Sequence, residues 1–79
     1  MNETKEKILA ILKEMHPEVE DFESIPDLVH GGTLNSLDIV MLVGELSDAF
    51  DIEIPPKEIA YENFDTLEGL TKMVERLED

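Results

Sequence analysis

Residues 37–50 constrain the fold most strongly, because their apolar side chains recur at helical spacing. The segment contains no proline and only one glycine. At about 100° per residue, one side of a helix would carry five of its apolar residues: Ile39, Leu42, Val43, Leu46 and Phe50. The pattern predicts a helix of about four turns whose one face packs against a core.

The start of this helix is predicted from Asn35. An asparagine side-chain oxygen can accept a hydrogen bond from the backbone N–H two or three residues on, which makes asparagine a favoured N-cap. With Asn35 as the cap, Ser36 is the first helical residue and follows the loop Gly31–Thr33. We expect the Ser36 hydroxyl to face solvent.

A second apolar stripe lies on the opposite side of the same helix, formed by Leu37, Val40, Met41 and Gly44. A helix in a domain with one core needs only one apolar stripe. The second stripe is flanked by carboxylates, those of Asp38, Glu45 and Asp48. An apolar centre with a charged rim is typical of interfaces, so the pattern favours a docking surface over a second buried contact.

Two further helices are predicted near the ends of the chain. The first spans about Asn2 to Met15 and ends before Pro17, and its core face carries Ile8, Ile11, Leu12 and Met15. The last begins at residues 65–68, which have the form of a capping box, and runs to about Leu77. Its core face carries Leu67, Leu70, Val74 and Leu77.

The connections between these helices are expected to carry short structure of their own. The long segment 17–32 should contain a single helical turn at Pro26–Leu28, and four apolar residues should anchor it to the core: Val19, Phe22, Ile25 and Leu28. Residues 51–54 read as extended, and Pro56 opens a short helix from Lys57 to about Tyr61. The prediction is one all-α domain, residues 1–79, built as a small bundle of three main helices plus one short helix.

The charge of the chain limits its partners. Twenty acidic residues against six basic ones give a formal net charge of -14. Phosphates need cationic neutralisation, so nucleic acid is excluded as a partner and an anionic membrane surface is disfavoured. No apolar run approaches the roughly 18 residues of a membrane span, and the first residues do not resemble a signal peptide. We expect a cytoplasmic protein whose partners present basic patches.

A catalytic role for Ser36 finds little support. A serine nucleophile needs a base within hydrogen-bond reach and a third group that orients the base. The only candidate bases are His16 and His30, and the pattern G-x-S-x-G is absent. No catalytic residue is therefore predicted.

The sequence predicts no metal site either. Asp48, Asp51 and Glu53 loosely resemble the start of an acidic calcium loop, but the glycine at its sixth position and the acid at its twelfth are missing. The chain has no cysteine, so it offers neither a thiolate ligand nor a thiol nucleophile.

An exposed serine at a helix start can also accept a covalent group, and here the chain resembles a known family. The run L-N-S-L-D-I-V at residues 34–40, followed by L-V-G-E-L-S-D-A-F-D-I-E-I-P at 42–55, is similar to the acyl carrier proteins. Their signature is D-S-L, an apolar helix and then F-x-x-x-I-P. In that family the serine is esterified by 4'-phosphopantetheine, whose thiol carries acyl or aminoacyl groups as thioesters. The resemblance implies a non-catalytic carrier with Ser36 as its attachment site.

The resemblance also implies which residues face partner enzymes. These are Asn35, Leu37, Asp38, Val40, Met41 and Gly44, with the nearby acids Glu45, Asp48 and Asp51. The implied partners are a phosphopantetheinyl transferase and the enzymes that load and transfer acyl or aminoacyl groups in a fatty acid, polyketide or other specialised pathway. A monomer suits a carrier that engages such partners in turn.

Two departures from the family pattern affect which partners are expected. The aspartate before the serine is replaced by Asn35, which keeps the cap but loses the charge. Met41 and Ser47 stand where carriers of fatty acid synthesis have more glutamate. The chain is in this respect closer to specialised stand-alone carriers, D-alanyl and other aminoacyl carriers among them, and its partners are predicted to differ from those of housekeeping fatty acid synthesis.

The alternative is a small acidic helical adaptor without a prosthetic group. Its apolar stripe would dock a partner helix, and Ser36 would be only a residue next to the cap or a phosphorylation site. The two interpretations differ in whether Ser36 accepts phosphopantetheine.

Overall fold

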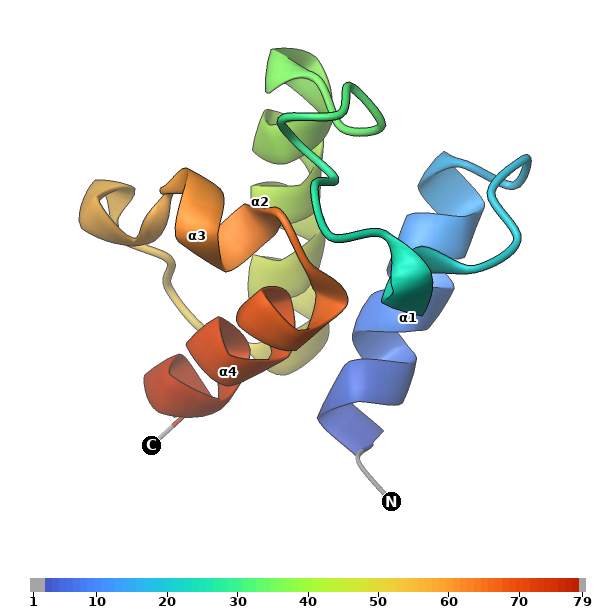
Figure 1. Ribbon diagram of the computed structural model, residues 1–79. Coiled ribbons are helices and arrows are strands. Elements are labelled where there is room, and N and C mark those ends of the chain that lie inside the picture. Colours follow the sequence, from blue (N-terminus) through green and yellow to red (C-terminus); the bar gives the residue numbers. More distant parts are fainter. Residues whose placement is uncertain (1–2, 79) are drawn as a thin grey trace.

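The computed structural model describes residues 3–78, and none of them lies in a β-strand. Three longer helices, α1 (Glu3–Met15), α2 (Ser36–Phe50) and α4 (Leu67–Glu78), pack around one core with the short helix α3 (Tyr61–Phe64). Two 3₁₀ turns, η1 (Phe22–Ser24) and η2 (Pro56–Glu58), lie in the connections. In Figure 1 the first turn of α2 lies at the opposite end of the molecule from the start of α1 and the end of α4. The predicted all-α bundle of three main helices plus one short helix is confirmed.

The core takes side chains from every helix and from the long connection. Its fully or nearly fully buried apolar residues are Ile8, Ile11, Leu12, Phe22, Leu28, Leu34, Leu42, Leu46, Ile54, Phe64, Leu67, Leu70, Met73 and Val74. Thr71 is the buried polar residue of the described chain, and its hydroxyl donates to the Leu67 carbonyl over 2.8 Å. That hydrogen bond removes the cost of burying an unpaired hydroxyl.

The predicted helix faces agree with the observed burial, while one helix start was predicted wrongly. The first helix ends at Met15 as expected, and Asn2 lies outside the described residues. The capping box predicted at residues 65–68 is wrong. Thr66 provides the cap instead, because its Oγ1 accepts from the Gly69 N–H over 2.9 Å. Asp65 is not free for this role, since its carboxylate holds the backbone of another loop.

The long connection has its helical turn earlier than predicted. The turn is η1, where the Asp21 carboxylate caps by accepting from the Glu23 N–H over 3.1 Å. The prediction of a turn at Pro26–Leu28 is wrong. Leu28 is buried, as predicted, and its N–H donates to the Asp65 carbonyl over 2.7 Å. The other predicted anchors also contact the core, with Phe22 buried and Val19 and Ile25 partly buried.

The short helix expected at Lys57–Tyr61 is also corrected, because two separate elements occupy this region. η2 ends at Glu58, and Ala60 has extended backbone (φ −131°, ψ 153°) before α3 begins. The Asn63 side chain donates to the Glu58 carbonyl over 2.7 Å, so this carbonyl needs no helical N–H four residues on. Within residues 3–78, no helix is long and apolar enough to cross a membrane.

Candidate attachment site

The first turn of α2 is held by a reciprocal pair of hydrogen bonds. Asn35 Oδ1 accepts from the Asp38 N–H over 2.8 Å, and Asp38 Oδ2 accepts from the Asn35 N–H over 3.1 Å. This capping box satisfies two backbone donors of the helix start. Ser36 is the first residue of the helix and is exposed. The predicted cap and the predicted position of Ser36 are both confirmed.

The loop before Ser36 is a tight turn that requires glycine. The Gly31 N–H donates to the Asp27 carbonyl over 2.6 Å, and a Cβ at Gly31 would lie 2.7 Å from that same oxygen. Gly32 has a φ of +88°, which side chains with a Cβ rarely adopt. Leu34 then enters the core, and its N–H donates to the Leu28 carbonyl over 2.7 Å. The loop therefore delivers Asn35 to the cap from an anchored position.

Asp65 ties this loop to the junction of α3 and α4. Its Oδ1 accepts from the N–H groups of Val29 and His30 over 3.0 and 3.1 Å, and its Oδ2 contacts His30 Nδ1 at 2.5 Å. Burial alone would raise the pKa of the Asp65 carboxyl, but these hydrogen bonds outweigh it and lower the pKa below its usual value. The His30 ring also packs on Tyr61, with centroids 4.3 Å apart.

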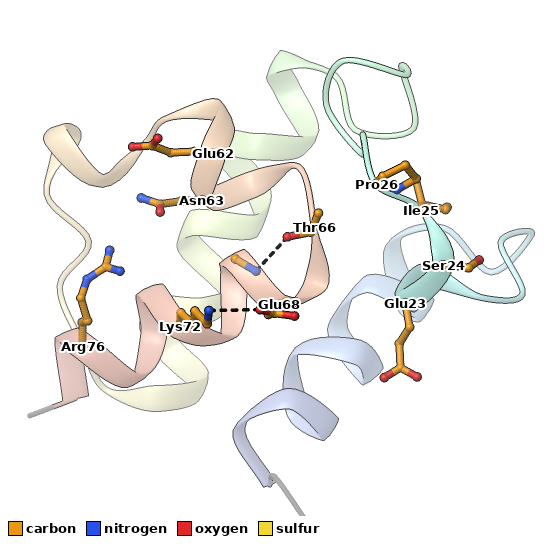
Figure 2. A pocket seen from close by; sticks show the side chains of 11 residues that line it. Glu23, Ser24, Ile25, Pro26, Glu62, Asn63, Thr66, Glu68, Lys72 and Arg76 are labelled. Atoms are coloured by element: carbon orange, nitrogen blue, oxygen red, sulfur yellow. Dashed lines mark hydrogen bonds and ion pairs between the residues drawn. The ribbon is translucent and has the colours of Figure 1, made fainter.

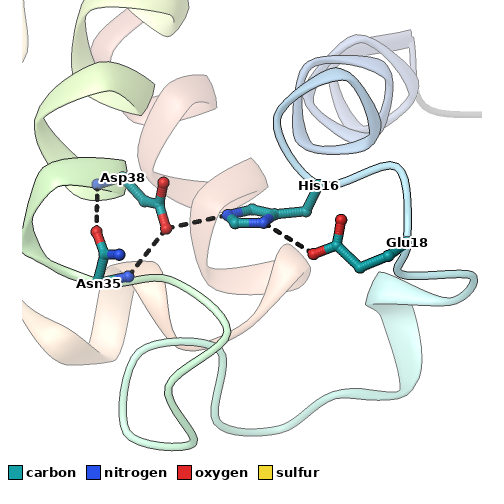
Figure 3. A network of polar contacts seen from close by, with 4 residues as sticks. All are labelled: His16, Glu18, Asn35 and Asp38. Carbon is teal, nitrogen blue, oxygen red and sulfur yellow. Dashed lines mark hydrogen bonds and ion pairs between the residues drawn. The ribbon is translucent and has the colours of Figure 1, made fainter.

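His16 reaches the first turn of α2 from the other side (Figure 3). Its Nε2 lies 3.0 Å from Asp38 Oδ2, and its Nδ1 lies 3.1 Å from Glu18 Oε2. Burial of the imidazole opposes protonation, but the hydrogen bonds and charges of Asp38 and Glu18 outweigh it and raise the pKa of His16. Sequence reasoning considered His16 only as a catalytic base and missed its contact with Asp38. No local sequence pattern indicates a contact between residues this far apart in the chain.

The second apolar stripe of α2 is solvent-exposed, as predicted. Leu37 and Val40 are each 67% exposed and Met41 is 51% exposed, whereas Leu42 and Leu46 are fully buried. A Cβ at Gly44 would meet no atom within 4 Å. The helix therefore has one face in the core and one open apolar face.

The acids predicted around this stripe fall into two groups. Glu45, Asp48 and Asp51 are exposed, and Asp51 ends the helix in a left-handed conformation (φ 53°, ψ 50°). The Asp38 side chain is only 14% exposed and is turned towards Asn35 and His16. Its carboxylate therefore organises the helix start rather than standing free on the rim.

An apolar pocket of about 380 Å³ lies between α2 and the segment that contains α3. It is lined by Ile39, Ile59, Ala60, Tyr61 and Phe64. Ile39 is three residues after Ser36, so the pocket begins one turn from the exposed serine. Sequence reasoning did not predict this pocket.

A larger hollow of about 670 Å³ lies elsewhere, between η1, α3 and α4 (Figure 2). Its cations are paired with carboxylates: Lys72 contacts Glu68 at 3.1 Å and Arg76 contacts Glu58 at 2.6 Å. No residue predicted for the site lines this hollow. In the part of the chain that the structure describes, no group of three or more acidic or histidine side chains could hold a metal ion.

Comparison with known proteins identifies the family of the chain. A family model described as a phosphopantetheine attachment site matches residues 27–74, which include Ser36 and its loop. The chain belongs to the phosphopantetheine-binding carrier protein family. Carriers of this family are non-catalytic and bear a covalently bound 4'-phosphopantetheine group.

Several relatives of this carrier are named D-alanyl carrier protein. The Lactococcus lactis protein is 34% identical over 76 residues, which cover 95% of this chain and 96% of the relative. The Streptococcus suis protein is 36% identical over 64 residues, 81% of each chain, and the Lactobacillus acidophilus protein is 29% identical over 77 residues, 98% of each chain. These relatives bear out the expected likeness to D-alanyl carriers, while a fatty acid or polyketide pathway stays a prediction.

The residues around Ser36 fit the prosthetic group that this family carries. The hydroxyl is exposed on the first residue of a helix of 15 residues, and a helix N-terminus favours a negatively charged phosphodiester. The chain has no cysteine of its own, so the reactive thiol would come from the arm.

Proposed function

We propose that Ser36 carries the phosphopantetheine arm and that the protein carries D-alanine on this arm as a thioester. One observation carries the proposal: an exposed serine stands at the first position of a capped helix in a chain whose relatives are named D-alanyl carriers. No residue of the chain offers a thiol, so the thioester needs the arm.

In the attachment step Ser36 Oγ attacks the pantetheine-bearing phosphorus of coenzyme A. The new O–P bond replaces the bond to the leaving 3',5'-ADP, and the hydroxyl proton passes to a base on the transferase. The chain itself positions the serine and provides the electrostatic field of the helix N-terminus. The capping box of Asn35 and Asp38 fixes the first turn, and the helix end favours the phosphodiester that remains.

The exposed face of α2 supports docking of the partner enzymes. Its apolar centre, Leu37, Val40 and Met41, is bordered by the exposed carboxylates of Glu45 and Asp48. With a net charge of -14, this surface favours partners that surround an apolar contact with basic side chains. We infer that the transferase and the loading enzyme both present such a surface.

The apolar pocket beside Ser36 favours a second candidate cargo, a longer acyl chain. Each buried methylene contributes about 0.8 kcal/mol, so a chain that entered the pocket would stabilise the fold in proportion to its length. A D-alanyl group has a single methyl and a charged amine, and it would remain in solvent. Melting temperatures of the D-alanyl, butanoyl and octanoyl forms distinguish the two cargoes, because only sequestered chains produce a rise with length.

The cargo is tested by loading the arm. The protein bearing phosphopantetheine is incubated with ATP and either a D-alanine-activating ligase with D-alanine or L-alanine, or an acylating ligase with octanoate. Ser36→Ala serves as the control. Mass gain with D-alanine alone, absent in Ser36→Ala, supports the proposal. Preference for octanoate, with an acylating ligase in place of the first enzyme, would favour the acyl carrier instead.

The proposed setting follows from the cosubstrates. Attachment consumes coenzyme A and loading consumes an activated amino acid, so we propose that the carrier works in the cytoplasm. We also propose that it is monomeric, because one apolar face must meet several enzymes in turn.

A further inference from the structure

Both ring nitrogens of His16 face carboxylate oxygens. Nε2 lies 3.0 Å from Asp38 Oδ2, and Nδ1 lies 3.1 Å from Glu18 Oε2 (Figure 3). An ionised carboxylate only accepts hydrogen bonds, and a neutral imidazole has only one N–H to donate. Both contacts can be hydrogen bonds only when the ring carries two protons. The arrangement is therefore that of an imidazolium.

We propose that protonated His16 clamps the first turn of α2 to the end of α1, and that it is in this way a positioning residue for Ser36. The proposal rests on attachment of the arm at Ser36. His16 itself is fixed to α1, because its backbone N–H donates to the Leu12 carbonyl over 2.9 Å. On α2, the Asp38 oxygen that His16 contacts also accepts from the Asn35 N–H. The clamp thus acts on the capping box that surrounds Ser36.

Loss of the His16 proton weakens this clamp in two ways. One ring nitrogen becomes an acceptor that faces a carboxylate, so one of the two hydrogen bonds is lost. The lost partner is expected to be Glu18, because its side chain is 69% exposed and can turn away to water. The remaining hydrogen bond to Asp38 then loses its positive charge, and charge-assisted hydrogen bonds are roughly twice as strong as neutral ones. The imidazolium also offsets the Asp38 carboxylate at the helix end that would bear a phosphodiester.

The clamp has a definite pH range. The charged groups that face the imidazole are Glu18 from the following loop and Asp38 from α2, and together they hold the pKa of His16 above its usual value against the effect of burial. The clamped form is therefore complete below the ordinary histidine pKa of about 6.5 and is lost as the pH rises through the higher value.

His30 provides a matched control in the same molecule. It also contacts an aspartate, but only its Nδ1 is engaged, with Asp65 Oδ2. One ring proton satisfies that contact, so a neutral tautomer is sufficient. Replacing His30 therefore also removes a contact between a histidine ring and an aspartate. Unlike the two contacts of His16, this single contact does not need two ring protons.

The test is the rate at which a broad-specificity phosphopantetheinyl transferase modifies Ser36, followed by intact mass with coenzyme A. Wild type, His16→Gln and His30→Gln are compared at about pH 6 and about pH 8.5, on either side of the histidine range. The ratio of wild-type to variant rate at each pH cancels the pH dependence of the transferase. We expect a ratio of about tenfold or more for His16→Gln at the lower pH, in line with loss of a hydrogen bond to a charged group. At the higher pH we expect a smaller ratio, because the neutral ring keeps one weaker hydrogen bond to Asp38.

A ratio for His16→Gln that is the same at both pH values would overturn the proposal, even if the variant is slower. At the lower pH, His30→Gln should slow modification less than His16→Gln does, because His30 contacts Asp65 and not the capping box of Asn35 and Asp38. Circular dichroism at the assay temperature establishes that each variant is folded.

A second measurement tests the clamp without the transferase. Urea unfolding should show that His16→Gln lowers the stability of the fold more at the lower pH than at the higher one. Equal destabilisation at both pH values contradicts the clamp. Absence of any modification of the wild-type protein would instead count against attachment at Ser36, so the two failures are distinguishable.

Discussion

Replacing Gly44 by alanine should stabilise the protein. Gly44 lies in the interior of α2, where glycine costs about 0.5–1 kcal/mol relative to alanine. A Cβ at this position would meet no atom within 4 Å, so no packing penalty opposes the gain. Gly44→Ala should therefore raise the free energy of unfolding by about 1 kcal/mol, which corresponds to about 6 °C in melting temperature for a domain of this size.

The assay is urea unfolding followed by circular dichroism, with melting temperature from calorimetry. The midpoint should rise at an unchanged denaturant slope. Gly69→Ala is the matched control, because it is the same substitution in α4, where the new Cβ would lie 2.7 Å from the Glu62 carbonyl oxygen. Overpacking against backbone should make it destabilising by about 1–3 kcal/mol. Equal effects of the two substitutions, or loss of stability in Gly44→Ala, would refute the reasoning.

The same variant probes the docking surface. Gly44 lies within the exposed stripe, where its missing side chain leaves room for a partner to approach the helix backbone. An added methyl at a close contact should lower kcat/KM of the loading enzyme for this carrier by about fivefold or more while the fold becomes more stable. If kcat/KM of the loading enzyme is the same for Gly44→Ala as for wild type, that enzyme does not contact the carrier closely at Gly44.

The remaining predictions concern the acidic residues. Asp51→Gly should stabilise by about 0.5–1 kcal/mol in urea unfolding, because a left-handed residue without a Cβ is less strained; Asp51→Asn tests the charge separately, and equal gains in both would assign the effect to charge. Asp65→Asn should cost about 1–2 kcal/mol near neutral pH. Since the pKa of Asp65 is lowered in the fold, its contribution is present above the usual aspartate value of about 3.9 and is lost as the pH falls through the lowered one. If the stability difference between wild type and Asp65→Asn stays the same as the pH falls into the acid range, this reasoning is contradicted. Millimolar magnesium or added salt should raise the melting temperature by screening the net charge of -14, and indifference to both would show that the acids are too dispersed to matter.

The parts of the fold that sequence predicted well are those determined locally. The start of α2 follows from Asn35 as a cap, and its two faces follow from helical periodicity, so the residue pattern by itself is enough to locate Ser36 and the exposed stripe. The same periodicity located the core faces of α1 and α4.

What sequence reasoning missed depends on contacts between distant segments. His16 meets Asp38 across 22 residues, and Asp65 meets Val29 across 36, and neither pairing has a local signature. Asp65 was also misread as a helix cap, because an aspartate before a helix can serve either its own helix or another loop. The apolar pocket beside α2 requires the position of α3, which periodicity alone does not provide.

The central claim is that Ser36 is the attachment site, and the intact mass of the protein after incubation with coenzyme A and a phosphopantetheinyl transferase tests it most directly. The account predicts a gain of one phosphopantetheine group in the wild-type protein and no gain in Ser36→Ala. No gain in wild type under conditions that modify an established carrier, or a gain that persists in Ser36→Ala, would contradict it.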